Sequence, residues 1–209
     1  MSWNETIARL YKEHDYPVVA PYRLEHPFNA ALINALFRMF RDETWESIGD
    51  LRSAVVSTWV ETASPTTLMA PDVWREMFAV TGQIEHGRYL PTEPMAVYRS
   101  ANIESSKGWS WAVDPSCTFH SPLMPKPSRV DFDLAMSRMP DMYWWKTTVQ
   151  PEQILITTAF GHPTTRSGVV LRERTTDEIV IDPRTIEHIE RVPIEEIRAY
   201  FDDPEEDRA

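Results

Sequence analysis

Three polar residues beyond residue 91 of the 209-residue chain are the first candidates for chemistry: Arg99, Ser110 and Glu178. Each lies in or beside a run of β-favouring residues, where a rigid strand could hold its side chain in place. An arginine can grip phosphate or ribose oxygens, a serine can hydrogen-bond to a ligand, and a carboxylate can stabilise a developing positive charge. Each residue also has an ordinary interpretation. Such positions often hold an exposed ion-pairing arginine, a small serine between tryptophans, or a solvated glutamate.

The sequence carries no pattern typical of a metal site or of a phosphate-binding loop. Its six histidines stand far apart, and Cys117 is its single cysteine, which excludes an internal disulfide. Zinc ligands normally include a closely spaced pair, so we expect no metal. The chain also has no Walker A sequence, no GxGxxG and no GxSxG nucleophile elbow.

The composition predicts an acidic globular protein. Hydrophobic residues make up 42% of the chain and include eight tryptophans, which is ample for a packed core. The formal net charge of −11 argues against a large nucleic-acid-binding surface, because such surfaces are usually basic. The sequence has neither an 18-residue apolar run nor a signal-peptide pattern at its start. We therefore expect a cytoplasmic protein with no membrane partner.

Helical periodicity dominates residues 1–90 and predicts three or four helices around one apolar seam. One of these helices is expected to begin after Asp42, a good N-cap residue, and to run toward Thr62. The role of this helical region stays open. The other expected helices are residues 3–14, a segment with Leu32, Leu36, Met39 and Phe40 on one face, and the stretch from Pro71 to Gly82.

Residues 91–201 have the pattern of a β-rich domain, and the acidic residues 202–209 that of a solvated tail. Prolines concentrate in residues 121–140, which we expect to form a long surface loop with a brief helix from Asp131 to Arg138. The expected fold class is α+β, with the helical N-terminal part packed on or beside the β-rich part. The expected strands are residues 94–100, 107–114, 142–150, 153–161, 168–174 and 177–183.

Four motifs follow one another along the β-rich part. They are Tyr98-Arg99, then Gly108-Trp109-Ser110-Trp111-Ala112-Val113-Asp114 with Phe119, then the run from Tyr143 to Leu155, and finally Glu178-Ile179-Val180-Ile181-Asp182-Pro183. In this order they resemble the R-S-E class of ADP-ribosyltransferases, the cholera-toxin-like branch with small bacterial and phage members. The resemblance covers about residues 94–190. It implies an ADP-ribosyltransferase-like split β-sheet core.

The resemblance implies an NAD⁺-dependent mono-ADP-ribosyltransferase, or an NAD⁺ glycohydrolase if water is the acceptor. NAD⁺ would be the substrate, the acceptor an unidentified protein or small molecule, and no metal would take part. Glu178 would be the catalytic carboxylate, because cleaving the nicotinamide–ribose bond develops an oxocarbenium-like ribose. The cofactor-binding residues that the resemblance implies are Arg99, Ser110, Trp111 and Phe119.

Two positions depart from the family pattern. Thr176 stands where many arginine-modifying members have Glu or Gln, so an arginine acceptor is not implied. Ala112 stands where the S-x-S/T pattern has its second hydroxyl, which weakens the hydrogen-bond network expected behind Glu178. These departures favour one alternative, a catalytically inactive interaction module with the ADP-ribosyltransferase fold. The other alternative is an unrelated inhibitor or adaptor that binds a protein through its acidic surface and exposed aromatic side chains.

Overall fold

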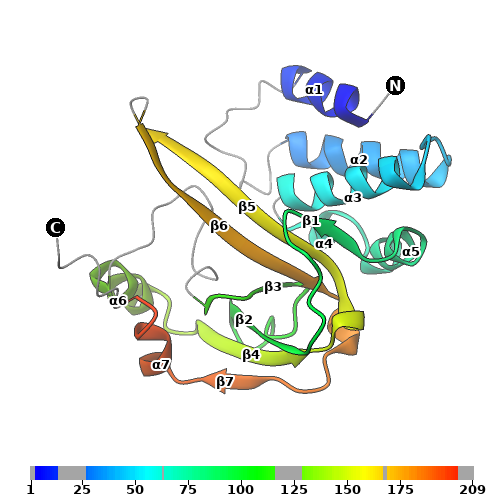
Figure 1. Cartoon of the computed structure of the whole chain (residues 1–209). Helices are drawn as coiled ribbons and strands as arrows, with labels where there is room; N and C mark the ends of the chain where they lie inside the picture. Colours follow the sequence, from blue (N-terminus) through cyan, green and yellow to red (C-terminus); the bar gives the residue numbers. More distant parts are fainter. Residues whose placement is uncertain (1–2, 14–26, 63, 116–128, 167–168, 202–209) are drawn as a thin grey trace. The chain divides into compact units, whose positions relative to one another are not determined.

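The mixed α+β class is confirmed, with helices in the N-terminal part of the chain and a seven-stranded sheet after them (Figure 1). The chain forms two compact units, Met1–Ile84 and Glu85–Ala209. The division comes before residue 91, because β1 (Ile84–His86) already belongs to the sheet. The acidic tail lies outside the described residues. The computed structural model describes residues 3–13, 27–62, 64–115, 129–166 and 169–201.

The N-terminal unit is built around an apolar seam, as its helical periodicity predicts. Leu51 is fully buried, and Trp59 meets Trp74 edge to face with ring centroids 4.9 Å apart. Pro71 and Gly82 bound one helix as expected, with Gly82 at a φ of 66°. The helices of this unit are α1 (Trp3–Glu13), α2 (Pro27–Arg41), α3 (Ile48–Glu61), α4 (Pro65–Leu68) and α5 (Pro71–Thr81).

The start of α3 differs from the sequence-based expectation. The helix begins at Ile48, and its N-cap is Ser47 rather than Asp42. Ser47 Oγ accepts a hydrogen bond from the backbone amide of Asp50 at 3.1 Å. Asp42 instead forms an ion pair with Arg41 at 2.7 Å. Both serine and aspartate are good caps, so residue type alone does not choose between the two positions.

This cap gives a prediction for the stability of the N-terminal unit. Ser47→Ala removes the acceptor of an amide that has no partner within the helix, and we expect it to lower the free energy of unfolding by about 1 kcal/mol. Urea unfolding followed by circular dichroism measures the change. Ser53→Ala is the control, because Ser53 Oγ only donates to the Gly49 carbonyl within the same helix. Its expected effect is within about 0.5 kcal/mol, and equal costs for both variants would contradict the capping role.

The C-terminal unit is built on a sheet with the strand order β1-β5-β6-β3-β2-β4-β7. Strand β6 runs without a break from Val169 to Ile181, although two separate strands were expected over residues 168–174 and 177–183. Strand β7 was not expected, because three residues are too few to show the alternation that predicts a strand. The remaining strands are β2 (Met95–Ala101), β3 (Ser110–Ala112), β4 (Tyr143–Val149), β5 (Ile154–Arg166), β6 (Val169–Ile181) and β7 (Glu190–Val192).

Strands β5 and β6 are longer than their neighbours and extend beyond them as a two-stranded ribbon (Figure 1). Strand β3 pairs with β6 only over residues 178–180, in an antiparallel ladder. Among the described residues, the part of β6 that precedes Glu178 pairs with β5 alone. Glu178 therefore lies where the ribbon enters the sheet.

The two faces of the sheet carry separate apolar clusters. One cluster contains Val97, Trp111 and Ile179. The other contains Tyr98 and Trp144. Successive side chains along a strand point to opposite faces of the sheet. The two clusters therefore identify the face to which each candidate side chain belongs.

The second cluster is completed by α6 (Arg129–Arg138) and α7 (Ile194–Arg198). Phe132 of α6 is fully buried and stacks on Phe201, with ring centroids 4.5 Å apart. The helix was expected as a brief element of a surface loop. Its buried aromatic ring instead makes it part of the core of this unit.

Candidate functional site

Three neighbouring strands carry the predicted residues, since β6, β3 and β2 are adjacent in the sheet. Glu178 of β6 lies opposite Ala112 of β3, which in turn lies opposite Tyr98 of β2. Ser110 precedes Ala112 by two residues, and Arg99 follows Tyr98 directly. The fold therefore gathers three residues that are far apart in the sequence into one small part of the sheet.

Ser110 and Glu178 share one face of this sheet, and Arg99 starts from the other. Ser110 lies opposite Val180, which is two residues from Glu178, so both candidate side chains are on one face. Arg99 follows Val97 by two residues in β2, and Val97 belongs to the cluster on the opposite face. All three candidate side chains are half-buried.

The Arg99 side chain holds the backbone next to Ser110. Its Nε donates to the Ser105 carbonyl oxygen at 3.2 Å, and its Nη1 donates to the Ser110 carbonyl oxygen at 2.6 Å. Burial lowers the pKa of the Arg99 guanidinium from its usual value, and the negative charge of Glu178 acts in the opposite direction. These contacts give Arg99 a positioning role and an electrostatic link to Glu178. A direct grip on NAD⁺ oxygens stays a prediction.

The loop of residues 102–109, which joins β2 to β3, is fixed from several sides. The Gly108 carbonyl oxygen accepts a hydrogen bond from Trp111 Nε1 at 2.7 Å. Lys107 Nζ donates to the Ile186 carbonyl oxygen at 2.9 Å. Together with the contacts of the arginine, these bonds fix the backbone that leads into Ser110, which is what a pre-organised site needs.

Gly108 gives a test of this arrangement, because a Cβ added there would overlap the Arg99 guanidinium. We expect Gly108→Ala to displace that guanidinium from its two carbonyl acceptors and to lower the free energy of unfolding by about 2 kcal/mol in urea denaturation. Gly49→Ala is the matched control, since a Cβ there meets only Ser47 Oγ at 3.6 Å. It should raise stability by about 0.5–1 kcal/mol, because alanine favours a helix over glycine. A Gly108→Ala variant as stable as the wild type would mean that Arg99 is not held as described.

The other predicted binding residues have different outcomes. Trp111 is 2% exposed and packs in the cluster with Val97 and Ile179. A contact of its ring with NAD⁺ stays a prediction. Phe119 lies outside the described residues. Thr176, the departure noted in the sequence, lies in β6 opposite Phe160 of β5.

The sequence placed Tyr98 only in the Tyr-Arg motif and gave no role to Tyr200, and it predicted neither as a neighbour of the candidate residues. Tyr98 shares the cross-strand row of Ala112 and Glu178 and is 9% exposed. Its hydrogen bond to Tyr200 raises the pKa of the Tyr200 hydroxyl, and burial and nearby carboxylates act in the same direction. The Tyr-Arg dipeptide was the one available signal for Tyr98, whereas Tyr200 follows α7 with no motif around it.

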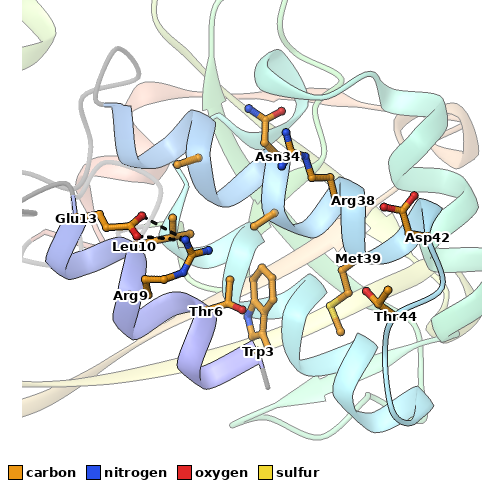
Figure 2. A pocket seen from close by; sticks show the side chains of 12 residues that line it. Trp3, Thr6, Arg9, Leu10, Glu13, Asn34, Arg38, Met39, Asp42 and Thr44 are labelled. Atoms are coloured by element: carbon orange, nitrogen blue, oxygen red, sulfur yellow. Dashed lines mark hydrogen bonds and ion pairs between the residues drawn. The ribbon is translucent and has the colours of Figure 1, made fainter. Parts of the chain in front are cut away.

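The described part of the chain contains two cavities whose lining does not include Arg99, Ser110 or Glu178. One, of about 560 Å³, lies between α1 and α2 (Figure 2). The other, of about 470 Å³, is lined mainly by residues of β4, β7 and the segments next to them. In this second cavity the Arg191 guanidinium lies over the Tyr143 ring, 3.8 Å from its centroid.

Within the described ranges, no group of three His, Cys, Asp or Glu side chains could hold a metal ion. No helix in the same part of the chain is long and apolar enough to cross a membrane. Comparison with protein-family models, with curated proteins and with solved structures found no match for this chain.

Proposed function

We propose that the protein cleaves the nicotinamide–ribose bond of NAD⁺ and passes ADP-ribose to an acceptor or to water. The observation that carries this proposal is that Glu178 and Ser110 lie on one face of two adjacent strands. The negative charge of Glu178 also interacts electrostatically with the Arg99 guanidinium. A carboxylate, a hydroxyl and a guanidinium are also the three groups that the R-S-E resemblance implies.

The proposed reaction develops positive charge on the substrate. Nicotinamide leaves with the electron pair of the glycosidic bond and becomes neutral, so it needs no strong general acid. The ribose left behind is oxocarbenium-like, and the Glu178 carboxylate stabilises its positive charge. The acceptor then attacks the anomeric carbon and loses its proton to solvent.

The other two residues act on the geometry and charge of Glu178. The Arg99 guanidinium favours the ionised carboxylate, because an opposite charge nearby stabilises the charged form. Arg99 also fixes the Ser110 backbone through its bond to the carbonyl oxygen. The Ser110 hydroxyl then hydrogen-bonds the nicotinamide ribose or orients Glu178. A pre-organised set of this kind lowers the reorganisation needed when the bond breaks.

Nicotinamide release from NAD⁺ by the full chain tests the proposal. We expect nicotinamide above the level of a heat-denatured control, measured by liquid chromatography. Adenine-labelled NAD⁺ added with a cell extract then shows whether protein, small molecules or water accept the ADP-ribose. If the protein showed no turnover and also no NAD⁺-dependent rise in melting temperature, the proposal would be overturned.

One observation favours a second candidate, an NAD⁺-binding module without activity. On the β3 side the residue opposite Glu178 is Ala112, which has no hydroxyl to hydrogen-bond the carboxylate. On the β5 side the residue opposite is Thr158, whose hydroxyl donates to the Glu178 backbone carbonyl oxygen at 3.4 Å. A ligand that binds only the folded state raises its melting temperature. Stabilisation by NAD⁺ with no release of nicotinamide would therefore support this candidate over the enzyme.

A further inference from the structure

Tyr98 and Tyr200 lie beside the proposed cleavage site, and Tyr98 is on the face of the sheet that carries Glu178. Tyr98 of β2 lies opposite Ala112 of β3, which lies opposite Glu178 of β6. Directly opposite side chains of antiparallel strands share a face. Two strand spacings separate Tyr98 from Glu178, which is about 10 Å between their Cα atoms. Because Ala112 has only a methyl group, no longer side chain stands between them in this row.

Tyr200 carries an aromatic ring that is fixed in place and yet accessible. Ile197 and Phe201, on either side of it in the sequence, are buried in the cluster, whereas Tyr200 is 38% exposed. The Tyr200 ring lies 6.4 Å from the ring of the buried Tyr98, measured between centroids. The two hydroxyls form a hydrogen bond. A ring held in this way can contact a ligand without first becoming ordered.

Negative charges lie near the Tyr200 hydroxyl. The bond to Tyr98 and burial raise the pKa of Tyr200 most, and the charges of Glu196 and Asp114 raise it further. Asp114 follows β3 by two residues, so these carboxylates come from two different elements of the unit. Negative charge beside an aromatic ring suits a planar cation, because the face of the ring also attracts positive charge. It does not suit a phosphate group, which the same carboxylates would repel.

We propose that Tyr200 forms the nicotinamide side of the site, with its ring against the cationic nicotinamide ring of NAD⁺ and with Tyr98 as its positioning residue. The inference rests on the proposed cleavage of NAD⁺ and adds which part of the substrate lies on the β2 side of Glu178. The nicotinamide ring is positive and the pyrophosphate negative, so the carboxylates select the orientation of the dinucleotide. Nicotinamide becomes neutral as the bond breaks, so Tyr200 contributes more to binding than to the rate of cleavage.

A charged and an uncharged form of the same ring test this inference without any turnover. The full chain is labelled with 3-fluorotyrosine, and the Tyr200→Phe variant assigns the fluorine signal of Tyr200. Added 1-methylnicotinamide, a cation, should move this signal with a dissociation constant on the order of 1 mM. Nicotinamide is neutral and should bind about fivefold more weakly, because it lacks the attraction to the ring face and to the carboxylates.

Two leucine variants separate the aromatic ring of Tyr200 from general effects on the sheet. Tyr200→Leu should weaken 1-methylnicotinamide about fivefold and raise the KM for NAD⁺ by a similar factor, with less than about a twofold change in kcat. Tyr143→Leu is the matched control and should change neither quantity. Tyr143 of β4 directly precedes Trp144 of the second cluster and therefore starts from the opposite face of the sheet.

The outcomes separate this inference from the proposed cleavage. A Tyr200 signal that does not move, equal affinity for the two probes, or a Tyr200→Leu variant with unchanged KM would overturn the role of Tyr200. Nicotinamide release by the wild type would leave the cleavage standing in each of these cases. A Tyr200 signal that moves with 1-methylnicotinamide in a chain without turnover would support the nicotinamide side and overturn only the reaction.

Discussion

Glu178→Gln is expected to lower the rate of nicotinamide release from NAD⁺ by about 100-fold or more, with little change in NAD⁺ affinity. In the proposed reaction the carboxylate acts mainly on charge that exists only in the transition state, so its loss should appear in kcat and not in binding. The amide keeps nearly the same shape and can still hydrogen-bond. Steady-state kinetics with NAD⁺, together with a thermal shift for binding, measure both quantities.

Glu190→Gln is the matched control for this experiment. Glu190 is a carboxylate on the same sheet, paired with Lys146 at 3.3 Å near the far edge in β7. Its replacement should change the rate less than twofold, because exposed ion pairs contribute little. Equal activity of wild type and Glu178→Gln, with both folded by circular dichroism, would remove Glu178 from the reaction.

Trp111→Ala is expected to lower the free energy of unfolding by about 3–5 kcal/mol, the usual cost of deleting a large buried aromatic side chain. The ring is buried in the cluster with Val97 and Ile179, and its Nε1 holds the Gly108 carbonyl oxygen. Urea unfolding measures the cost. Trp111→Phe keeps an aromatic ring but loses the N–H bond, and we expect an intermediate value.

Tyr89→Ala serves as the control for Trp111, because Tyr89 is a large aromatic residue of the same unit but is 85% exposed. Its effect should stay within about 0.5 kcal/mol. The sequence alone also allowed Trp111 to line a nicotinamide pocket. A Trp111 variant that is as stable as the wild type but shows no NAD⁺-dependent rise in melting temperature would indicate that the Trp111 ring contacts NAD⁺.

The helical half of the fold was predictable because a 3.6-residue period is a strong signal over 10 or more residues. Pro71 and Gly82 marked the ends of α5 correctly, since each is suited to its end for a backbone reason. The start of α3 was not predictable in the same way. Asp42 and Ser47 both cap well, and only the course of the chain between α2 and α3 decides which of them does so.

The β-rich half was predictable as strands but not in its extent. A strand of three residues such as β7 has no period to detect, and its existence depends on pairing with β4. The break expected in β6 near Thr175 and Thr176 does not occur, because β5 pairs along its whole length there. Phe132 likewise becomes a core residue only through contact with Phe201.

The candidate site was predictable as a set of residues but not as a geometry. Sequence order shows that Arg99, Ser110 and Glu178 all lie in β-favouring runs, yet the strand order that makes these runs neighbours is set by long-range pairing. The face from which each side chain starts depends on register, where a shift of one residue reverses the face. The contact of Arg99 with the Ser105 and Ser110 carbonyl oxygens has no sequence pattern at all.

The place of Glu178 at the root of the β5–β6 ribbon has a mechanical consequence. On the side that precedes Glu178, β6 pairs only with β5 among the described residues, while β1 joins β5 on the other edge. Glu178 is thus the first residue of β6, in chain order, that is paired on both sides. A change in the bend of the ribbon would therefore reach Glu178 before it reached Ile179 and Trp111, which are buried in the core.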